Sequence, residues 1–153
     1  MKISKNIEPG IYVLLLLATQ THHTPLKSHT LSQILQVSDS SLKKVLRKLV
    51  VHGLITSTAS KDGGFVLRRP LTDITLLDVM HALEGPELLE FQSSHLAQQI
   101  FPDKAHTAAS EVAVTTALAA ANAAYEAQLA HFYLSSIIKA GALSDGLVDW
   151  EAH

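Results

Sequence analysis

The chain has 153 residues, which suggests one domain, or one small domain with an appended oligomerisation element. Its residues are 47% apolar and 17% charged, so it can bury a core and is not intrinsically disordered. The formal charge is only −2, yet residues 1–70 hold ten Lys and Arg against three acids, whereas residues 71–153 hold two against eleven. This division excludes a uniformly basic nucleic-acid coat and predicts that the first half faces a polyanion.

The sequence contains no cysteine, and its longest apolar run, residues 11–18, has eight residues. Disulfides, zinc–thiolate sites, cysteine-ligated iron–sulfur clusters and thiol catalysis are therefore excluded. The run is shorter than the roughly 20 residues of a membrane span, and no basic segment leads directly into it as in a signal peptide. We expect a cytoplasmic protein with no membrane partner.

The first predicted helix covers residues 10–20. Pro9 suits a first helical turn because its missing N–H would have no partner there, and the residues after it are apolar on nearly every face, so we expect this helix to be buried. A polar loop with Pro25 follows. Thr30 and Gln33 have the spacing of a capping box, which predicts that a short second helix begins at Thr30.

A third helix is expected over about residues 39–52, with Ser38 as its N-cap and Gly53 after its end. Its apolar side chains recur with the spacing of one buried helical stripe: Leu42, Val45, Leu46, Leu49 and Val50. Its other face is basic and hydroxyl-bearing. Two short helices joined by a tight polar turn, the second with a basic outer face, predict a helix-turn-helix.

Two extended segments follow, residues 54–58 and 65–69, joined by a polar turn with Asp62, Gly63 and Gly64. They predict a β-hairpin, and a hairpin directly after a helix-turn-helix is a wing. Pro70 ends the second strand. Arg68 and Arg69 alternate across that strand, so at most one of them is expected to face DNA.

Thr75 and Asp78 form a second capping-box pattern, which begins a helix that Gly85 ends. Alanine-rich sequence from about residue 107 into the 130s predicts a long helix. Its candidate dimerisation residues recur at steps of three and four: Val114, Leu118, Ala121, Tyr125, Leu129 and Phe132. A helix that long beside a compact domain needs a partner surface, and a second copy of the chain is the expected partner.

The expected fold class is therefore mainly α, a winged helix-turn-helix domain with a two-stranded β wing plus a long C-terminal dimerisation helix. The expected organisation is a DNA-binding domain over residues 1–86, a linker over 87–106, a dimerisation helix region over 107–141 and a tail over 142–153.

One stretch resembles a known family. Gly63-Gly64-Phe65-Val66-Leu67 and Ile74-Thr75-Leu76-Leu77-Asp78-Val79 are similar to the wing and following helix of the Rrf-two (Rrf2) family of bacterial winged-helix transcription regulators, the group of IscR, NsrR and CymR. The resemblance covers roughly residues 1–140. It implies a homodimer in which the long helices cross and two recognition helices enter adjacent major grooves of a palindromic operator.

The resemblance also implies differences from other members. Family recognition helices read bases with side chains at places matching Ser40, Lys43 and Lys44. At the places of Lys43 and Lys44 the family often has acidic or amide residues. The operator sequence of this protein is therefore expected to differ from those of such members. A wing arginine of the family falls near Ala59, where Lys61 is the candidate replacement. Members with an iron–sulfur cluster use three cysteines in the region matching about 90–106, where this chain has none.

The expected function is a DNA-binding transcriptional regulator, more specifically a repressor, that binds double-stranded DNA as a homodimer. Lysine and arginine neutralise phosphates, and side chains at the start of the recognition helix reach base edges. The candidate DNA-binding residues are Ser4, Ser40, Ser41, Lys43, Lys44, Arg47, Lys48, Lys61, Gly63 and Gly64.

Two alternatives stay open. The winged helix is also used as a protein-interaction module, whose basic face would meet an acidic partner. A histidine-based metal-responsive regulator would use His22, His23 and His29 or His95 and His106, although their spacing does not favour a metal site. No catalytic set stands out, so we do not expect an enzyme or a cofactor. An effector of unknown kind would fit a small apolar pocket lined by Met80, Leu83, Phe91 and Phe101.

Overall fold

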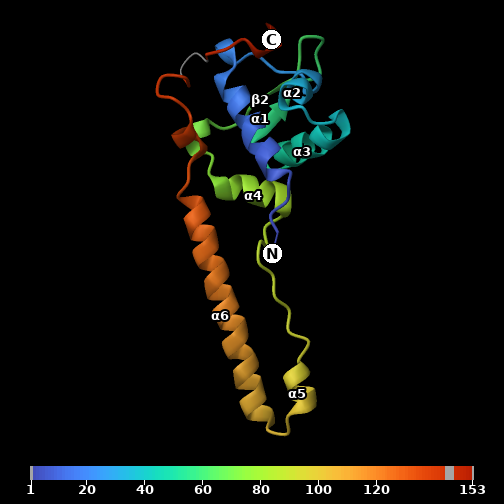
Figure 1. Ribbon diagram of the computed structural model, residues 1–153, viewed down its shortest axis with the longest axis vertical. Helices are drawn as coiled ribbons and strands as arrows, with labels where there is room; N and C mark the ends of the chain where they lie inside the picture. The colour runs from blue at the N-terminus through green and yellow to red at the C-terminus, as the bar shows by residue number, and fades with distance from the viewer. Residues whose placement is uncertain (1, 144–146, 153) are drawn as a thin grey trace.

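The computed structural model describes residues 2–143 and 147–152. A winged-helix domain forms one end of the molecule, and a long helix extends from it as an arm (Figure 1). A short helix near the far end of the arm lies beside it, at the end of an extended segment that leaves the domain. The predicted fold class is confirmed.

Three helices begin the domain: α1 (Ile7–Thr19), α2 (Ser28–Leu35) and α3 (Asp39–Val51). Pro9 lies in the first turn of α1, as predicted. The predicted start of α2 at Thr30 is wrong, because the helix begins at Ser28 without a side-chain cap. The Thr30 hydroxyl instead donates to Glu151 Oε2 at 2.7 Å. The Thr30 hydroxyl therefore contacts Glu151, near the end of the chain, instead of capping the helix.

The turn between α2 and α3 is closed by backbone conformation and by capping. Gln36 adopts a left-handed conformation with φ of +54°, which lets the Val37 N–H donate to Ser32 O at 3.2 Å. Ser38 is the N-cap of α3, as predicted, and its Oγ accepts from the Ser41 N–H. The Ser32 hydroxyl donates to Asp39 Oδ1 at 2.5 Å and so joins the two helices directly.

The wing consists of β1 (Ile55–Ser57) and β2 (Phe65–Leu67), which pair antiparallel with Ile55 opposite Leu67. Both strands are shorter than predicted, and Arg68 and Arg69 follow β2 rather than belonging to it. Leu26, from the loop after α1, extends the sheet by exchanging backbone hydrogen bonds with Phe65.

Helix α4 (Leu76–Glu84) begins with the predicted capping box between Thr75 and Asp78. The Asp78 carboxylate also pairs with Arg69, with 3.2 Å between Nη2 and Oδ2. One arginine of the adjacent pair is therefore bound to an acid, which ties the end of the wing to α4.

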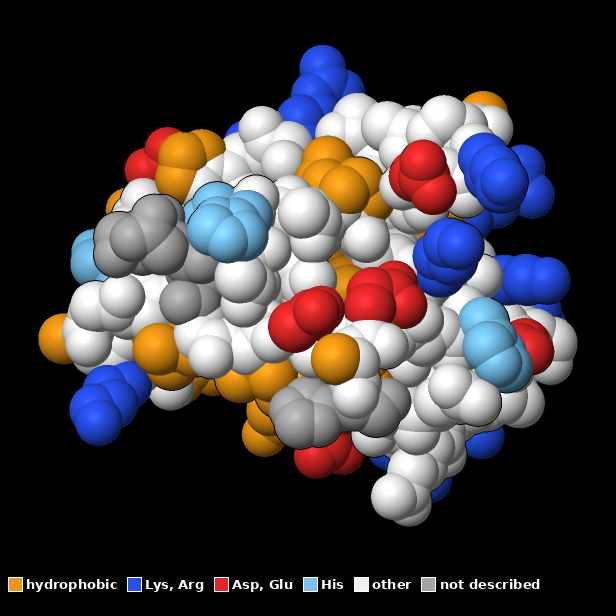
Figure 2. Space-filling model, turned by 90° about the horizontal axis from the view of Figure 1, so that it is seen from above, with side chains coloured by type: hydrophobic (Ala, Val, Ile, Leu, Met, Phe, Trp, Pro, Cys, Tyr) orange, Lys and Arg blue, Asp and Glu red, His pale blue; other side chains and the backbone are white. Residues whose placement is uncertain are grey.

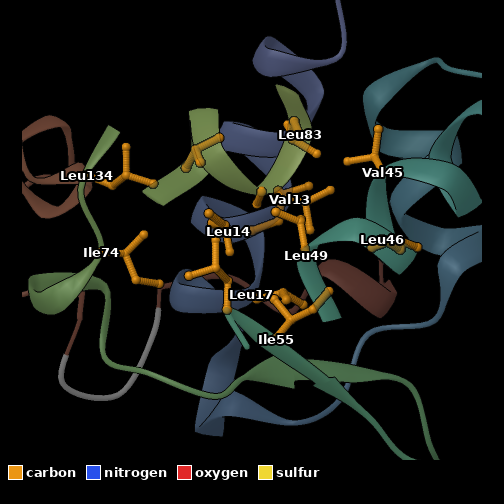
Figure 3. Packing of buried hydrophobic residues seen from close by; sticks show 14 of the residues in the cluster. Val13, Leu14, Leu17, Val45, Leu46, Leu49, Ile55, Ile74, Leu83 and Leu134 are labelled. Atoms are coloured by element: carbon orange, nitrogen blue, oxygen red, sulfur yellow. The ribbon is translucent and has the colours of Figure 1, made fainter. Parts of the chain in front are cut away.

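The core lies between α1, α3, α4 and the wing, as Figure 3 shows for the labelled side chains. Val13 and Leu14 of α1, Leu49 of α3 and Ile74 before α4 are fully buried. The burial of apolar side chains from these elements provides the main favourable free energy of this small domain.

Helix α5 (Leu96–Ile100) lies within the predicted linker, and α6 (Lys104–Ala130) forms the arm. The arm begins three residues before the predicted Thr107, because the Asp103 side chain caps it by accepting from the His106 N–H. At 1.5 Å per residue, its 27 residues span roughly 40 Å.

The chain after α6 returns to the domain. The short helix η3 (Leu134–Ile137) places Leu134 in the core, and its N–H donates to Ile74 O at 2.9 Å. The segment just after α6 was expected to belong to the dimerisation helix region. It instead packs on the winged-helix domain through Leu134. The remaining short helices are η1 (Thr21–His23), η2 (Leu71–Asp73) and η4 (Trp150–Ala152).

The described part of the predicted tail lies on the domain as well. Val148 forms a β-bridge with Gln20, and the Trp150 N–H donates to Gln20 Oε1 at 2.8 Å. Gln20 is only 2% exposed, so these bonds satisfy a buried amide. Residues 144–146 and 153 of the expected tail lie outside the described residues.

Candidate nucleic-acid interface

The outer face of α3 carries a row of exposed polar side chains. Its buried face holds Leu42, Val45, Leu46 and Leu49, which leaves Ser40, Lys43, Lys44 and Arg47 pointing away from the core. These four residues follow the i, i+3, i+4, i+7 spacing of one helix face. The sequence prediction placed them together on the surface, and the structure does so too.

Lys48 differs from its neighbours on α3. Its Nζ donates to Leu83 O at 2.9 Å, in the last turn of α4, where a positive charge stabilises the carbonyl end of the helix. Ser41, at the start of α3, is bound within the helix cap, because the Ser38 hydroxyl donates to its Oγ at 2.8 Å. The ammonium of Lys48 joins α3 to α4 and is held away from a ligand on the outer face.

The N-terminal segment lies beside the start of α3. Lys5 and Asn6 line the same shallow depression, about 220 Å³, as Ser38 and Ser41. Ser4 is held by its backbone, whose N–H donates to Glu84 Oε1 at 3.1 Å, and its Oγ accepts from the Asn6 N–H. Ser4 was a predicted DNA-binding residue, whereas Lys5, which is exposed beside it, was not predicted. The one feature of the sequence that could have indicated Lys5 as a DNA-binding residue is its position in the basic half of the chain.

The wing loop is closed by Thr58 and two glycines. The Gly64 N–H donates to Thr58 Oγ1 at 3.1 Å, and the Gly63 N–H to Ser60 O at 2.8 Å. A Cβ on Gly63 would lie 2.3 Å from Thr58 O, and one on Gly64 would lie 2.5 Å from Leu26 O. Both glycines therefore permit close backbone approach, and the solvent-exposed tip is formed by residues 59–62, including Lys61.

Several of the positively charged side chains lie on one side of the domain. Figure 2 looks onto the domain end of the molecule, and several Lys and Arg side chains gather at its right edge, on the side where Figure 1 places α2 and α3. Asp39 at the start of α3 and Asp62 in the wing are the acids closest in sequence to this surface. Such a surface suits a polyanion.

The arm leaves apolar side chains exposed. Val114 and Leu118 are 52% and 42% exposed, and Ala121 is exposed as well. Nearer the domain, Leu129 packs against the core, Tyr125 is half-buried, and Phe132 is held through its carbonyl, which accepts from the Leu76 N–H. The candidate dimerisation residues thus divide into an exposed outer part and an inner part attached to the domain.

The contact between α5 and the arm is polar. His95 Nδ1 lies 2.8 Å from Glu111 Oε2, and the Gln98 amide donates to the same oxygen at 2.9 Å. The hydrogen bond from His95 lowers the pKa of Glu111, against the opposing effect of its burial. Glu111 is therefore ionised at neutral pH and holds α5 on the arm.

The expected effector pocket is not formed as predicted. Met80 and Leu83 are core residues, 5% and 4% exposed, and Phe101 lies in the open at 56% exposed. Phe91 does line a cavity of about 500 Å³ between the linker and α6. The apolar residues of α4 are used for packing, so they are not available to line this space.

The candidate histidine ligands are dispersed. His29 lies 4.0 Å from Asp39, and His95 is bound to Glu111. Within residues 2–143 and 147–152, no group of three or more His, Asp or Glu side chains is placed to hold a metal ion. In the same residues, no helix is both long and apolar enough to cross a membrane.

The chain is similar to known transcriptional regulators. The family described as Rrf2, iron-dependent transcriptional regulator, matches residues 3–140. The HTH-type transcriptional regulator YwgB of Bacillus subtilis is 42% identical over 106 residues, which are 69% of this chain and 67% of YwgB. YffB of Lactococcus lactis, named likewise, is 41% identical over 118 residues, 77% of this chain and 74% of YffB.

Solved structures share the fold. CymR, the global cysteine regulator of B. subtilis, matches with a TM-score of 0.62 at 23% identity, over 90% of this chain and 95% of CymR. The IscR of T. potens matches with a TM-score of 0.63 at 19% identity, over 100% of this chain and 97% of IscR.

The residues of this chain do not fit an iron–sulfur cluster with thiolate ligands. The sequence has no cysteine, and the region between α4 and α6 offers His95 already bonded to Glu111. Iron named in the family description therefore has no thiolate ligand set here.

Proposed function

Because this chain belongs to the Rrf2 family of transcriptional regulators, we propose that it binds a palindromic operator as a cytoplasmic homodimer and represses transcription by blocking the promoter. The observation that carries this proposal is the exposed face of α3, with Lys43, Lys44 and Arg47 in one row and the wing beside it. Such a helix fits the major groove, and the wing meets the adjacent backbone.

Each residue of this surface has its own proposed role. Ser40, Lys43 and Lys44 lie in the first half of α3, where side chains reach base edges. Arg47, Lys5 and Lys61 lie around them as exposed cations, which suits contacts to phosphates. Gly63 and Gly64 shape the wing, and Lys48 fixes α3 on α4.

Promoter DNA tests the function directly. We expect a fluorescence-anisotropy titration to give sub-micromolar affinity that falls steeply as salt rises, because binding releases counterions from phosphates. Weak and sequence-blind binding at ~150 mM salt would contradict the proposal and favour an acidic protein partner for the same face.

Two variants test the separate roles. Lys44→Ala should change the order of preference among operator sequences, because a base contact is lost. Lys61→Ala should weaken all sequences similarly and reduce the salt dependence by about one counterion. Lys139→Ala, an exposed lysine after the arm, is the matched control and should change neither. Equal losses on every sequence for Lys44→Ala and Lys61→Ala would refute this assignment.

A further inference from the structure

The segment of residues 147–152 is attached to the domain beside the start of α2 (Figure 1). The Leu147 N–H donates to Thr19 O at 2.9 Å, and the Trp150 indole N–H donates to Thr19 Oγ1 at 3.1 Å. Together with the bonds of the buried Gln20 amide, these contacts fix the segment at the end of α1. The side chain of its Glu151 is therefore held at one place on the domain.

The Glu151 carboxylate lies at the N-terminus of α2. Its Oε1 accepts from the Lys27 N–H at 3.2 Å, and its Oε2 accepts from the Thr30 hydroxyl at 2.7 Å. Lys27 is the N-cap residue of α2, and its own side chain makes no cap. The first N–H groups of a helix lack partners within the helix and form the positive end of its dipole. An oxyanion from 121 residues beyond Thr30 in the sequence thus occupies this end.

The same end of α2 is where a helix-turn-helix meets the DNA backbone. The second helix of the motif lies in the major groove while the first helix crosses the backbone, and α2 is that first helix. Phosphates bind readily at helix N-termini. The exposed side chain of Lys27 adds a cation at this point. A DNA phosphate and the Glu151 carboxylate therefore require the same two donors, on Lys27 and Thr30.

We propose that Glu151 competes with DNA for the start of α2. In the free protein its carboxylate occupies the Lys27 and Thr30 donors, and a phosphate of the DNA backbone displaces it on binding. The two groups carry like charges, so they do not share the donors. The apparent affinity for DNA falls in proportion to the fraction of molecules in which the donors are free. This inference rests on the proposed function, because the competing ligand is DNA.

Glu151→Gln in the full chain tests the competition. A neutral amide binds the helix N-terminus more weakly than a carboxylate, so a fluorescence-anisotropy titration should show DNA affinity raised about threefold to tenfold. The gain should be equal on operator and random duplexes, because a phosphate contact carries no sequence information. Without DNA, the midpoint of chemical denaturation should fall, since a stabilising contact is lost. A purely structural contact would lower both stability and DNA affinity.

Three further variants separate competition from a general effect of charge. Glu151→Asp keeps the charge but shortens the side chain, so it should also raise DNA affinity. Asp73→Asn removes an exposed acid of η2 in the same domain, and as the matched control it should leave DNA affinity unchanged. Thr30→Val should weaken DNA binding about threefold or more in the Glu151→Gln protein, and less in the parent, where the hydroxyl is already occupied.

The outcomes distinguish this inference from the proposed function. If the parent binds operator DNA and Glu151→Gln gives no gain, or a gain that Asp73→Asn matches, the competition is refuted and the proposed function stands. An equal effect of Thr30→Val in both backgrounds would refute it too. If neither the parent nor the variant binds any DNA, the proposed function fails and the inference fails with it.

Discussion

At the residue scale, a side chain's role depends on partners distant in sequence. Lys48 belongs to the same basic run as Lys43, Lys44 and Arg47, yet its ammonium binds the last turn of α4. Gly64 has the position of a flexible loop glycine, yet it is needed because Leu26 passes beside it. Composition identifies such residues as basic or small, and the neighbouring backbone decides what they do.

Gly64→Ala tests the close approach in the wing. The new Cβ would lie 2.5 Å from Leu26 O, so the bridge between Leu26 and Phe65 must open or shift. We expect the free energy of unfolding to fall by about 1–3 kcal/mol, measured by chemical denaturation. Ser60→Ala in the same exposed loop is the control, since it adds no atom. An unchanged stability in Gly64→Ala would show that the wing adapts freely.

At the element scale, the presence of each main helix was predictable from the sequence, whereas the residues at which the helices begin and end were less predictable. Thr75 and Asp78 cap α4 as their spacing indicates, because both partners lie within one turn. The same spacing at Thr30 and Gln33 does not begin a helix, because Glu151 accepts hydrogen bonds from the Thr30 hydroxyl and the Lys27 N–H. A local pattern predicts a boundary only where no remote group competes for it.

The segment after α6 offers a matched pair of variants in one element. Leu134 is fully buried and Ile137 is 50% exposed, both in η3. Leu134→Ala should lower the free energy of unfolding by about 2–5 kcal/mol, because it leaves a cavity in the core. Ile137→Ala should cost less than about 1 kcal/mol. Similar losses measured by denaturation of both variants would show that η3 is not packed on the domain in this way.

At the scale of the whole molecule, the arm and the domain expose different kinds of side chain. The domain buries its leucines and exposes lysines on α3, whereas the arm exposes Val114 and Leu118 on a helix of 27 residues. Exposed apolar side chains on a projecting helix favour association. The proposed dimer would cover them and would place two recognition helices on one operator.

Leu118→Glu tests the proposed dimer. A charge at a residue 42% exposed in the isolated chain should leave the fold intact and prevent association. We expect analytical ultracentrifugation to show a monomer and operator affinity to fall by roughly 10²-fold or more, because two linked sites no longer bind together. Ala120→Glu, exposed on the opposite face of α6, is the control. A Leu118→Glu protein that stays dimeric would place the interface elsewhere.

The winged helix-turn-helix, the long helix and the basic face of α3 were all predictable from the amino-acid sequence. Each rests on short-range rules: a helical stripe from Leu42 to Leu49, a cap at Ser38, two strands around a turn, and an alanine-rich run. The absence of cysteine likewise needs only the sequence. Periodicity and capping act within a few residues, so they can be seen without coordinates.

The contacts between remote segments could be seen only in the folded chain. The fold places Leu134 in the core, Val148 beside Gln20 and Glu151 at the start of α2. These contacts link residues separated by tens of positions or more. Their formation depends on the path of the chain back from the arm, which no local pattern encodes.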